Sequence, residues 1–210
     1  KWIGEFGDEY SQRNELDQDL IENRMSLFSE LFTVIGYTPR EILEIGAGNG
    51  QNMVAIHNIL GMYASTRPNM LTHNISLHAI EPNKTARKKL LTNVPMCNIR
   101  EGDIFNTNCA DSSMEFVFTS GVLIHIHPED LDRAITEMHR VSSKYIFMME
   151  YFAPQSEEIK YQGENGMLWR NDFGSLFLDK FKMRVVRYGF AWKRITKLDN
   201  LTWWLLEKTH

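Results

Sequence analysis

The chain has 210 residues, which suits one large domain, and 43% of them are apolar, which is enough for a sizeable core. The formal net charge of −4 argues against a nucleic-acid partner, because holding a nucleic-acid backbone usually takes a basic face. No apolar run approaches the roughly 20 residues that span a bilayer, so we expect no membrane partner.

The two cysteines, Cys97 and Cys109, are too few for a disulfide framework and make no zinc site by themselves. Reduced thiols are the simplest interpretation, and they favour a cytoplasmic location. Because the chain starts at Lys1 and not at a methionine, we expect a processed or truncated chain, and the absence of a signal peptide has little weight. The basic cluster from Arg87 to Lys89 is explained more simply as a solvated helix face than as a nucleic-acid patch.

The opening segment, "KWIGEFGDEYSQRN", places three aromatic side chains four residues apart: Trp2, Phe6 and Tyr10. Two glycines, Gly4 and Gly7, weaken a helix in this segment. Two interpretations stay open. The segment is either a cover that becomes ordered when a ligand binds, or an aromatic stripe that anchors a terminal helix to the core.

Helical and strand patterns alternate along the rest of the chain. Helices are predicted over 14–36, 51–60, 83–91, 128–141 and 172–181, and strands over 41–46, 75–81, 97–103, 114–120, 144–150, 183–189 and 201–207. Residues 61–74 are predicted as a long polar loop, and no helix is expected between the last two strands. This order predicts an α/β fold with a mostly parallel sheet, covered on both faces, and one antiparallel strand at an edge.

A glycine-rich turn, "EIGAGNG" (44–50), follows the first predicted strand and opens a helix. Glycines suit this position because the turn needs open backbone angles and because a ligand can approach a backbone without Cβ atoms. The spacing is not the G-x-G-x-x-G of nicotinamide dinucleotide sites, and the Gly-Lys-Ser/Thr of a phosphate-binding loop is missing. The turn therefore indicates a different ligand, or structure alone.

Acidic residues end the next two strands. Glu81 follows the second strand, where a carboxylate can accept hydrogen bonds from both hydroxyls of a ribose, and Asp103 follows the third, where it could bind an adenine amino group while Ile104 packs on the ring. Each acid alone fits a helix cap or a turn equally well. Together with Glu44 they form an ordered series at the carboxyl ends of successive strands, the edge at which such sheets bind ligands.

These motifs resemble the class I S-adenosylmethionine-dependent methyltransferases. "EIGAGNG", "AIEPN", "EGDIF" and "MEFVFTSGVLIHIHPEDL" are similar to successive motifs of that family, and the resemblance covers nearly the whole chain. It implies a Rossmann-like, doubly wound, seven-stranded sheet with an N-terminal helical cap, S-adenosylmethionine as cofactor and S-adenosylhomocysteine as product. The cofactor-binding positions it implies are Glu44, Gly46, Ala47, Gly48, Gly50, Glu81, Pro82, Asp103, Ile104, Ser120 and Gly121.

A narrower resemblance concerns both ends of the chain. "WIGEFGDEYSQRN", "LWRNDFG" (168–174) and "LDNLTWWLLEK" (198–208) resemble the pseudaminic acid biosynthesis-associated methyltransferases. The name of that subgroup implies a sugar or sugar-derived acceptor. We expect a single methyltransferase domain over 1–210, with a lid and helix at 1–36, a core at 37–210 and a flap at about 152–174.

Methyl transfer needs an aligned acceptor, exclusion of water and, for some acceptors, removal of a proton. In the lid interpretation Tyr10 contacts the acceptor or takes part in catalysis, and Arg13 pairs with the cofactor carboxylate or with an acidic acceptor. His125 and His127 follow the fourth strand, and either could accept the proton. The same two histidines could instead shape the loop or, given their H-x-H spacing, bind a metal; we expect no metal.

The acceptor side is predicted from the residues after strand five and from the flap. Glu150 and Tyr151 could orient an acceptor, and Tyr161, Trp169 and Arg170 could contact a sugar or a phosphorylated acceptor. Packing for Trp169 and a surface position for Arg170 are the alternatives. The expected function is methyl transfer to oxygen or nitrogen of a small polar metabolite. A cofactor-binding protein without turnover and a nucleic-acid methyltransferase are the rivals.

Overall fold

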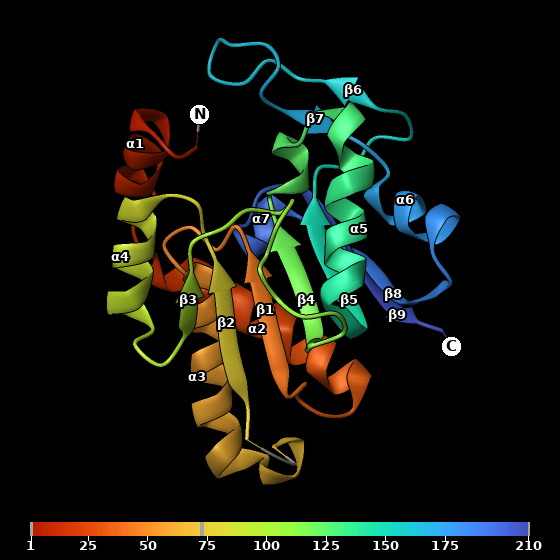
Figure 1. Cartoon of the computed structure of the whole chain (residues 1–210). Helices are drawn as coiled ribbons and strands as arrows, with labels where there is room; N and C mark the ends of the chain where they lie inside the picture. The colour runs from red at the N-terminus through yellow and green to blue at the C-terminus, as the bar shows by residue number, and fades with distance from the viewer. Residues whose placement is uncertain (1, 72–73, 210) are drawn as a thin grey trace. The chain divides into compact units, whose positions relative to one another are not determined.

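The computed structural model describes residues 2–71 and 74–209 (Figure 1). Contacts divide the chain into two compact units, one ending at Asp103 and the other beginning at Ile104. The first unit contains α1 (Glu5–Arg13), α2 (Gln18–Ile35), β1 (Glu41–Ile45), α3 (Gln51–Thr66), a 3₁₀ turn (Pro68–Met70), β2 (Ser76–Ile80), α4 (Lys84–Asn93) and β3 (Asn98–Arg100). The second contains β4 (Met114–Ser120), 3₁₀ turns at Leu123–His125 and Pro128–Asp130, α5 (Leu131–Val141), β5 (Ser142–Glu150), β6 (Glu157–Glu158), β7 (Trp169–Arg170), α6 (Phe173–Lys180), β8 (Met183–Ala191), α7 (Lys193–Thr196) and β9 (Leu201–Lys208).

The first unit has three parallel strands in the order β3-β2-β1. The register pairs Ile45 with Ile80 and Ile80 with Arg100, so the three strands end together and their following turns meet at one edge. Helix α2 begins where the side chain of Asp17 accepts from the backbone N–H of Leu20 at 3.0 Å and ends at Gly36, whose φ is +91°. It packs its buried face on α3.

The second unit has four strands in the order β4-β5-β9-β8. β4 and β5 are parallel, whereas β9 runs antiparallel to both β5 and β8. The core between these strands and their helices includes Phe116, Phe118 and Phe147, whose rings pack on one another. All seven predicted sheet strands are present, and the mostly parallel sheet with an antiparallel strand toward one edge is confirmed, that strand being β9.

The opening segment, for which a terminal helix was one of the two open interpretations, is helical in spite of its glycines, because α1 makes tertiary contacts that outweigh a weak helix propensity. Two details differ from the sequence prediction. Helix α3 continues through the first part of the expected 61–74 loop to Thr66, and residues 72–73 lie outside the described part of the chain. A short helix, α7, joins β8 to β9, so the expectation of no helix there is wrong.

The predicted flap contains a small antiparallel pair, β6 with β7, in which Glu157 faces Arg170 and Glu158 faces Trp169. The boundaries of the single predicted domain stay a prediction. None of the helices in the described ranges, 2–71 and 74–209, has both the length and the apolar character needed to cross a membrane.

Candidate functional site

The glycine-rich turn leaves β1 with three left-handed residues, Gly46, Gly48 and Gly50, at φ values of +75°, +53° and +87°. The backbone N–H groups of Gly46 and Ala47 both donate to the carbonyl of Ile80, at 2.8 and 3.2 Å, which ties the turn to the end of β2. Gly50 is required for a second reason, because a Cβ there would lie 2.1 Å from Leu90 Cδ1. A Cβ on Gly48 would meet nothing within 4 Å, so this side of the turn is open to a ligand.

Glu81 holds the turn in place. One carboxylate oxygen accepts from the backbone N–H of Gly48 at 2.8 Å, and the other accepts from the backbone N–H of Asn83 at 2.8 Å. The side chain is largely buried, and this burial raises its pKa, against the lowering effect of the two backbone hydrogen bonds. Each oxygen keeps a second lone pair, so the carboxylate can still accept hydrogen bonds from a ligand.

Glu44, the first acid of the predicted series, faces the covered side of β1. Only 1% of the residue is exposed, and one carboxylate oxygen accepts from the Asn52 side chain at 2.6 Å. Arg24 of α2 donates to the same Asn52 at 2.9 Å. Burial raises the pKa of Glu44 to about 8. The prediction that Glu44 contacts the cofactor directly does not fit this burial, and the residue supports the turn from behind.

Helix α1 docks on the loop that carries Glu81, as Figure 1 shows at the N-terminal end of α4. The Asn83 side chain donates to the carbonyl of Trp2 at 3.1 Å and to the carboxylate of Asp8 at 3.0 Å, while its oxygen accepts from the backbone N–H of Ala86 and caps α4. Gly7 permits this close approach, because a Cβ there would lie 1.8 Å from the Trp2 carbonyl oxygen.

A second set of contacts joins α1 to the glycine-rich turn itself. The Ser11 hydroxyl donates to the Asn49 side chain at 2.6 Å, and the Asn49 amide donates to the carbonyls of Ser11 and Asn14 at 2.7 and 2.6 Å. Lys89 also donates to the Ser11 carbonyl, at 2.9 Å. Helix α1 therefore bonds with both the turn and the Glu81 loop.

The aromatic residues of the opening segment, Trp2 before α1 and Phe6 and Tyr10 within it, are partly exposed and pack on one another. The Trp2 ring meets the rings of Phe6 and Tyr10 edge-on, with centroids 5.1 and 5.2 Å apart. Arg13, the last residue of α1, is exposed. Both earlier interpretations, cover and packing stripe, are compatible with this arrangement, because α1 is packed on the turn and still presents part of its aromatic surface.

Three further predicted cofactor-binding positions follow the second and third strands: Pro82, Asp103 and Ile104. The carbonyl of Pro82 accepts from Arg87 at 2.7 Å, and Asp103 is exposed at the end of the unit. Ile104, which was expected to pack on an adenine ring, is 3% exposed and belongs to the second unit.

In the second unit the loop after β4 is held by a buried carboxylate. Ser120 and Gly121 open the loop, with Gly121 at φ +68°. Glu150, at the end of β5, accepts from the Thr119 hydroxyl at 2.9 Å and from the backbone N–H groups of Val122 and Ile124 at 3.2 and 3.3 Å. Glu150 is fully buried, and its burial raises its pKa to about 7. The expectation that it touches an acceptor does not fit; it positions the loop.

The two histidines of this loop have different surroundings. His125 is bonded through Nδ1 to the carbonyl of Met167 at 2.7 Å, and its ring meets Tyr161 edge-on at 5.3 Å. Burial lowers its pKa, so the ring is neutral near pH 7. With Nδ1–H donating to the carbonyl, the lone pair lies on Nε2 and can accept a proton. His127 is exposed and packs on Trp169, with ring centroids 5.2 Å apart.

The strand pair β6–β7 brings flap residues to this loop. Trp169 is buried, in agreement with a packing role, whereas Arg170 is exposed and pairs with Glu157 at 3.3 Å.

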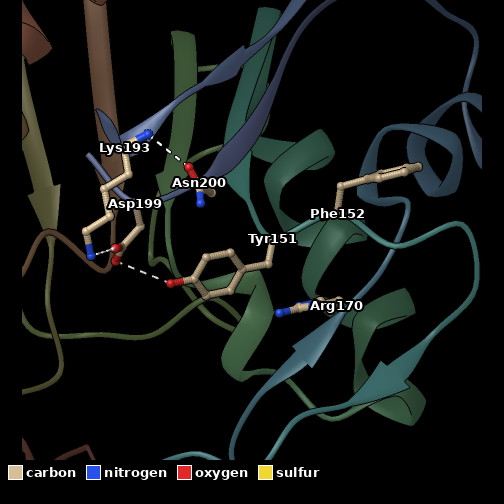
Figure 2. Close-up of a pocket in the computed structure, with 6 residues that line it drawn as sticks. All are labelled: Tyr151, Phe152, Arg170, Lys193, Asp199 and Asn200. Atoms are coloured by element: carbon tan, nitrogen blue, oxygen red, sulfur yellow. Dashed lines mark hydrogen bonds and ion pairs between the residues drawn. The ribbon is translucent and has the colours of Figure 1, made fainter. Parts of the chain in front are cut away.

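A cavity of about 390 Å³ lies beside Trp169 and Arg170 and is lined by Tyr151, Phe152, Arg170, Lys193, Asp199 and Asn200 (Figure 2). Among the described residues, no group of three or more His, Cys, Asp and Glu could hold a metal ion.

The sequence interpretation missed several of these residues. Asn49 and Asn83 lie inside recognised motifs, "EIGAGNG" and "AIEPN", but their partners in α1 are distant in the sequence. Asn83 could have been found as a helix cap from its position at the start of a helical pattern. Lys193, Asp199 and Asn200 had no signal beyond the short polar connection between the last two strands.

Comparison with known proteins gives an independent result. A family model described as a methyltransferase domain matches residues 42–144, slightly less than half of the chain. Magnesium protoporphyrin IX methyltransferase from Synechocystis PCC 6803, with S-adenosylhomocysteine bound, is similar in structure with a TM-score of 0.68 and 9% identity, over 99% of this chain and 97% of that chain. A search of curated proteins finds no matching relative.

Two further solved structures are similar. The 1,6-didemethyltoxoflavin-N1-methyltransferase from Burkholderia thailandensis has a TM-score of 0.65 and 10% identity, over 92% of this chain and 80% of that chain. A SAM-dependent methyltransferase from Leishmania major has a TM-score of 0.64 and 16% identity, over 89% and 70%. At these identities the structures show a shared, Rossmann-like methyltransferase fold. The partial family match and the shared fold agree with the class I methyltransferase resemblance of the sequence motifs; they do not test the narrower pseudaminic acid resemblance.

Proposed function

We propose that this chain transfers the methyl group of S-adenosylmethionine to an oxygen or nitrogen atom of a small polar metabolite, of which a sugar or sugar-derived acceptor is the preferred kind. The structurally similar proteins named above include methyltransferases of a porphyrin and of a toxoflavin precursor, both small molecules. The sugar part of the proposal comes from the resemblance of the chain ends to the pseudaminic acid biosynthesis-associated methyltransferases.

The observation that carries the proposal is the bond between Glu81 and the glycine-rich turn. The carboxylate fixes the backbone of Gly48 at 2.8 Å and keeps lone pairs for ribose hydroxyls, and the open side of Gly48 leaves room for the methionyl part. These residues therefore fit the cofactor. When bound, S-adenosylmethionine supplies a methyl group on a positively charged sulfur, and S-adenosylhomocysteine remains after transfer.

Residues of the second unit have the chemistry to prepare the acceptor. His125 is neutral near pH 7 and can take the proton that the acceptor atom releases as it bonds to the methyl carbon. Glu150 keeps the loop before His125 in position through its backbone bonds. Tyr10, Arg13 and the flap residues Tyr161 and Trp169 stay proposals as contacts to acceptor or cofactor.

Calorimetry with the purified chain tests the cofactor. We expect micromolar binding of S-adenosylmethionine and S-adenosylhomocysteine, no binding of NADH or ATP, and at least a tenfold loss of affinity in Glu81→Ala. Glu22→Ala, which removes an exposed carboxylate on α2, is the matched control and should bind as the unchanged chain does. A folded chain that binds neither compound would refute the methyltransferase proposal and leave the turn a structural feature.

A turnover assay separates an enzyme from a protein that only holds the cofactor. The chain is incubated with methyl-labelled S-adenosylmethionine and fractionated small metabolites, and label is followed into product. His125→Asn should lower the rate at least a hundredfold without changing cofactor affinity, whereas His127→Asn, a change at an exposed ring, should leave most of the rate. Cofactor binding without product from any fraction would favour the binding protein.

A further inference from the structure

A cavity beside the flap is lined mainly by polar and charged side chains. It lies between the end of β5, strand β7 and the α7–β9 connection. Figure 2 shows the Tyr151 side chain reaching across the cavity toward Asp199, with Lys193 and Asn200 on the same side and Arg170 entering from β7. Phe152 extends away from the other five.

The hydrogen bonds among these residues leave several N–H donors for a ligand, beside the remaining lone pairs of the Asp199 carboxylate. The Asp199 carboxylate accepts from the Lys193 ammonium at 2.9 Å through one oxygen and from the Tyr151 hydroxyl at 3.2 Å through the other. The Asn200 side-chain oxygen accepts from the backbone N–H of Lys193 at 2.9 Å, so the amide group presents its NH₂. The Lys193 ammonium keeps two further N–H donors.

Arg170 adds to this set. Its guanidinium group donates one hydrogen bond, from Nη1 to a carboxylate oxygen of Glu157 at 3.3 Å. A guanidinium has five N–H donors in total, so further donors are available to a ligand. The side chain is about half exposed at the mouth of the cavity. Carboxylates and phosphates are the groups that a planar guanidinium binds in a bidentate manner.

The surrounding charge also favours an anion. Residues 180–197, which include Lys193, contain seven lysines and arginines and no aspartate or glutamate, although the whole chain carries a net charge of −4. Lys193 is the residue of this stretch that lines the cavity, and the lining as a whole carries two cations, Arg170 and Lys193, against one carboxylate, Asp199. This excess of positive over negative charge in the lining raises the local concentration of anionic ligands.

The cavity lies next to the loop assigned to catalysis within the same unit. Tyr151 directly follows Glu150, whose carboxylate holds the backbone of Val122 and Ile124. Trp169, the neighbour of Arg170, packs on His127 of that loop. A ligand in the cavity would therefore lie at the carboxyl edge of β4 and β5, where ligands of such sheets bind.

We propose that this cavity is the acceptor subsite and that it takes an anionic acceptor, whose carboxylate or phosphate is bound by Lys193, Arg170 and Asn200 while its ring packs on Tyr151. This inference rests on the proposed function, because it treats the ligand of the cavity as the methyl acceptor. It goes beyond that function by naming the charge of the acceptor and the residues that select it.

Three ring compounds of matched size test the proposal by saturation-transfer NMR at millimolar concentration: glucuronate, glucose 6-phosphate and glucose. We expect at least one of the two anions to bind and glucose to bind at least tenfold more weakly. The stronger anion distinguishes a carboxylate from a phosphate preference. Lys193→Met should weaken that anion at least tenfold, and Lys182→Met, which removes an exposed cation outside the cavity, should not change it.

A second variant tests the ring contact separately from the charged groups. Tyr151→Leu removes the ring wall and should weaken the anion and glucose alike, with circular dichroism confirming that each variant is folded. Equal binding of glucose and the anions, no binding of either anion, or anion binding unaffected by Lys193→Met would each overturn the inference. Failure of the proposed function is seen separately, as loss of S-adenosylmethionine binding in the calorimetric titration of the unchanged chain.

Discussion

Glu44 illustrates how burial decides the protonation of a carboxyl group in this chain. Its side chain lies behind the glycine-rich turn with one hydrogen bond, from Asn52, and a second oxygen that has no partner. Such a site favours the neutral acid over the anion, which raises the pKa from 4.5 to about 8. At neutral pH the folded chain therefore holds a proton here that the unfolded chain has released.

This difference predicts a dependence of stability on pH. Between about pH 4.5 and 8 the folded state binds more protons at Glu44 than the unfolded state, so the free energy of unfolding falls as the pH rises through this window. Glu44→Gln removes the titration and should give a shallower slope in urea unfolding between pH 5 and 8.5. Glu22→Gln, on the exposed face of α2, controls for the loss of one carboxylate. An unchanged slope in Glu44→Gln would contradict a neutral Glu44.

Glu81 and Glu150 show what a sequence can say about a candidate site. Each ends or follows a strand, and strand prediction places both at the carboxyl edge of the sheet. Their roles differ because Glu81 faces an open turn, whereas the Glu150 carboxylate is closed in by Thr119 and the backbone after it. Which side of a strand end is covered depends on packing by distant segments, and no local pattern in a single sequence contains that information.

At the scale of elements, α1 is the segment whose structure depends most on distant contacts. It is a nine-residue helix, too short to be stable alone in water. Its docking depends on the Asn83 amide, which donates to Trp2 and Asp8, and on the Ser11 bonds with Asn49. The hydrogen bonds of Asp8 with Thr85 and Asn83 also lower the pKa of this partly exposed carboxyl group.

Asn83→Asp tests this docking. The new carboxylate keeps the oxygen that caps α4 but loses both donors, and it places a negative charge beside Asp8. We expect α1 to detach while the rest of the chain stays folded, seen as faster tryptic cleavage after Arg13. Asn58→Asp, the same change at an exposed position of α3, should leave cleavage as it is. Equal cleavage rates in both variants would show that Asn83 does not hold α1.

Two glycines of the first unit should respond in opposite directions to alanine. Gly61 lies inside α3, where a Cβ would meet nothing within 4 Å, so Gly61→Ala should stabilise the fold by about 0.5–1 kcal/mol, the usual difference in helix propensity. Gly50→Ala should destabilise it, because φ is +87° and the Cβ would collide with Leu90. Thermal unfolding of both variants measures this, and a lower melting temperature in Gly61→Ala would contradict it.

The elements that were predicted correctly are those with a strong periodic pattern. β4 was placed at 114–120 and α5 within 128–141, because both have a regular apolar period and clear boundaries. The elements that were missed, α7 and the pair β6–β7, are short and have weak patterns. Helix α1 contains glycines whose cost is offset only by contacts with α4 and the turn, which are more than 35 residues away in the sequence.

For the molecule as a whole, the two thiols provide a reporter in each compact unit. Cys97 lies in the first unit and Cys109 in the second, and both are buried. Burial raises the pKa of Cys97 to about 12, so its thiol should react with a thiolate-specific reagent only when the surrounding structure opens. The rate of labelling then measures how often each unit opens.

The proposed cofactor site predicts that bound S-adenosylmethionine slows the labelling of Cys97. The glycine-rich turn and Glu81 both belong to the unit that contains Cys97. A ligand that binds only the folded form reduces opening by a factor of 1 + [L]/Kd, so S-adenosylmethionine at 100 times its Kd should slow labelling of Cys97 about a hundredfold. Mass spectrometry of digested samples gives the rate for each thiol. An unchanged rate at Cys97 would place the cofactor elsewhere, and the response of Cys109 shows whether the two units unfold in one cooperative step.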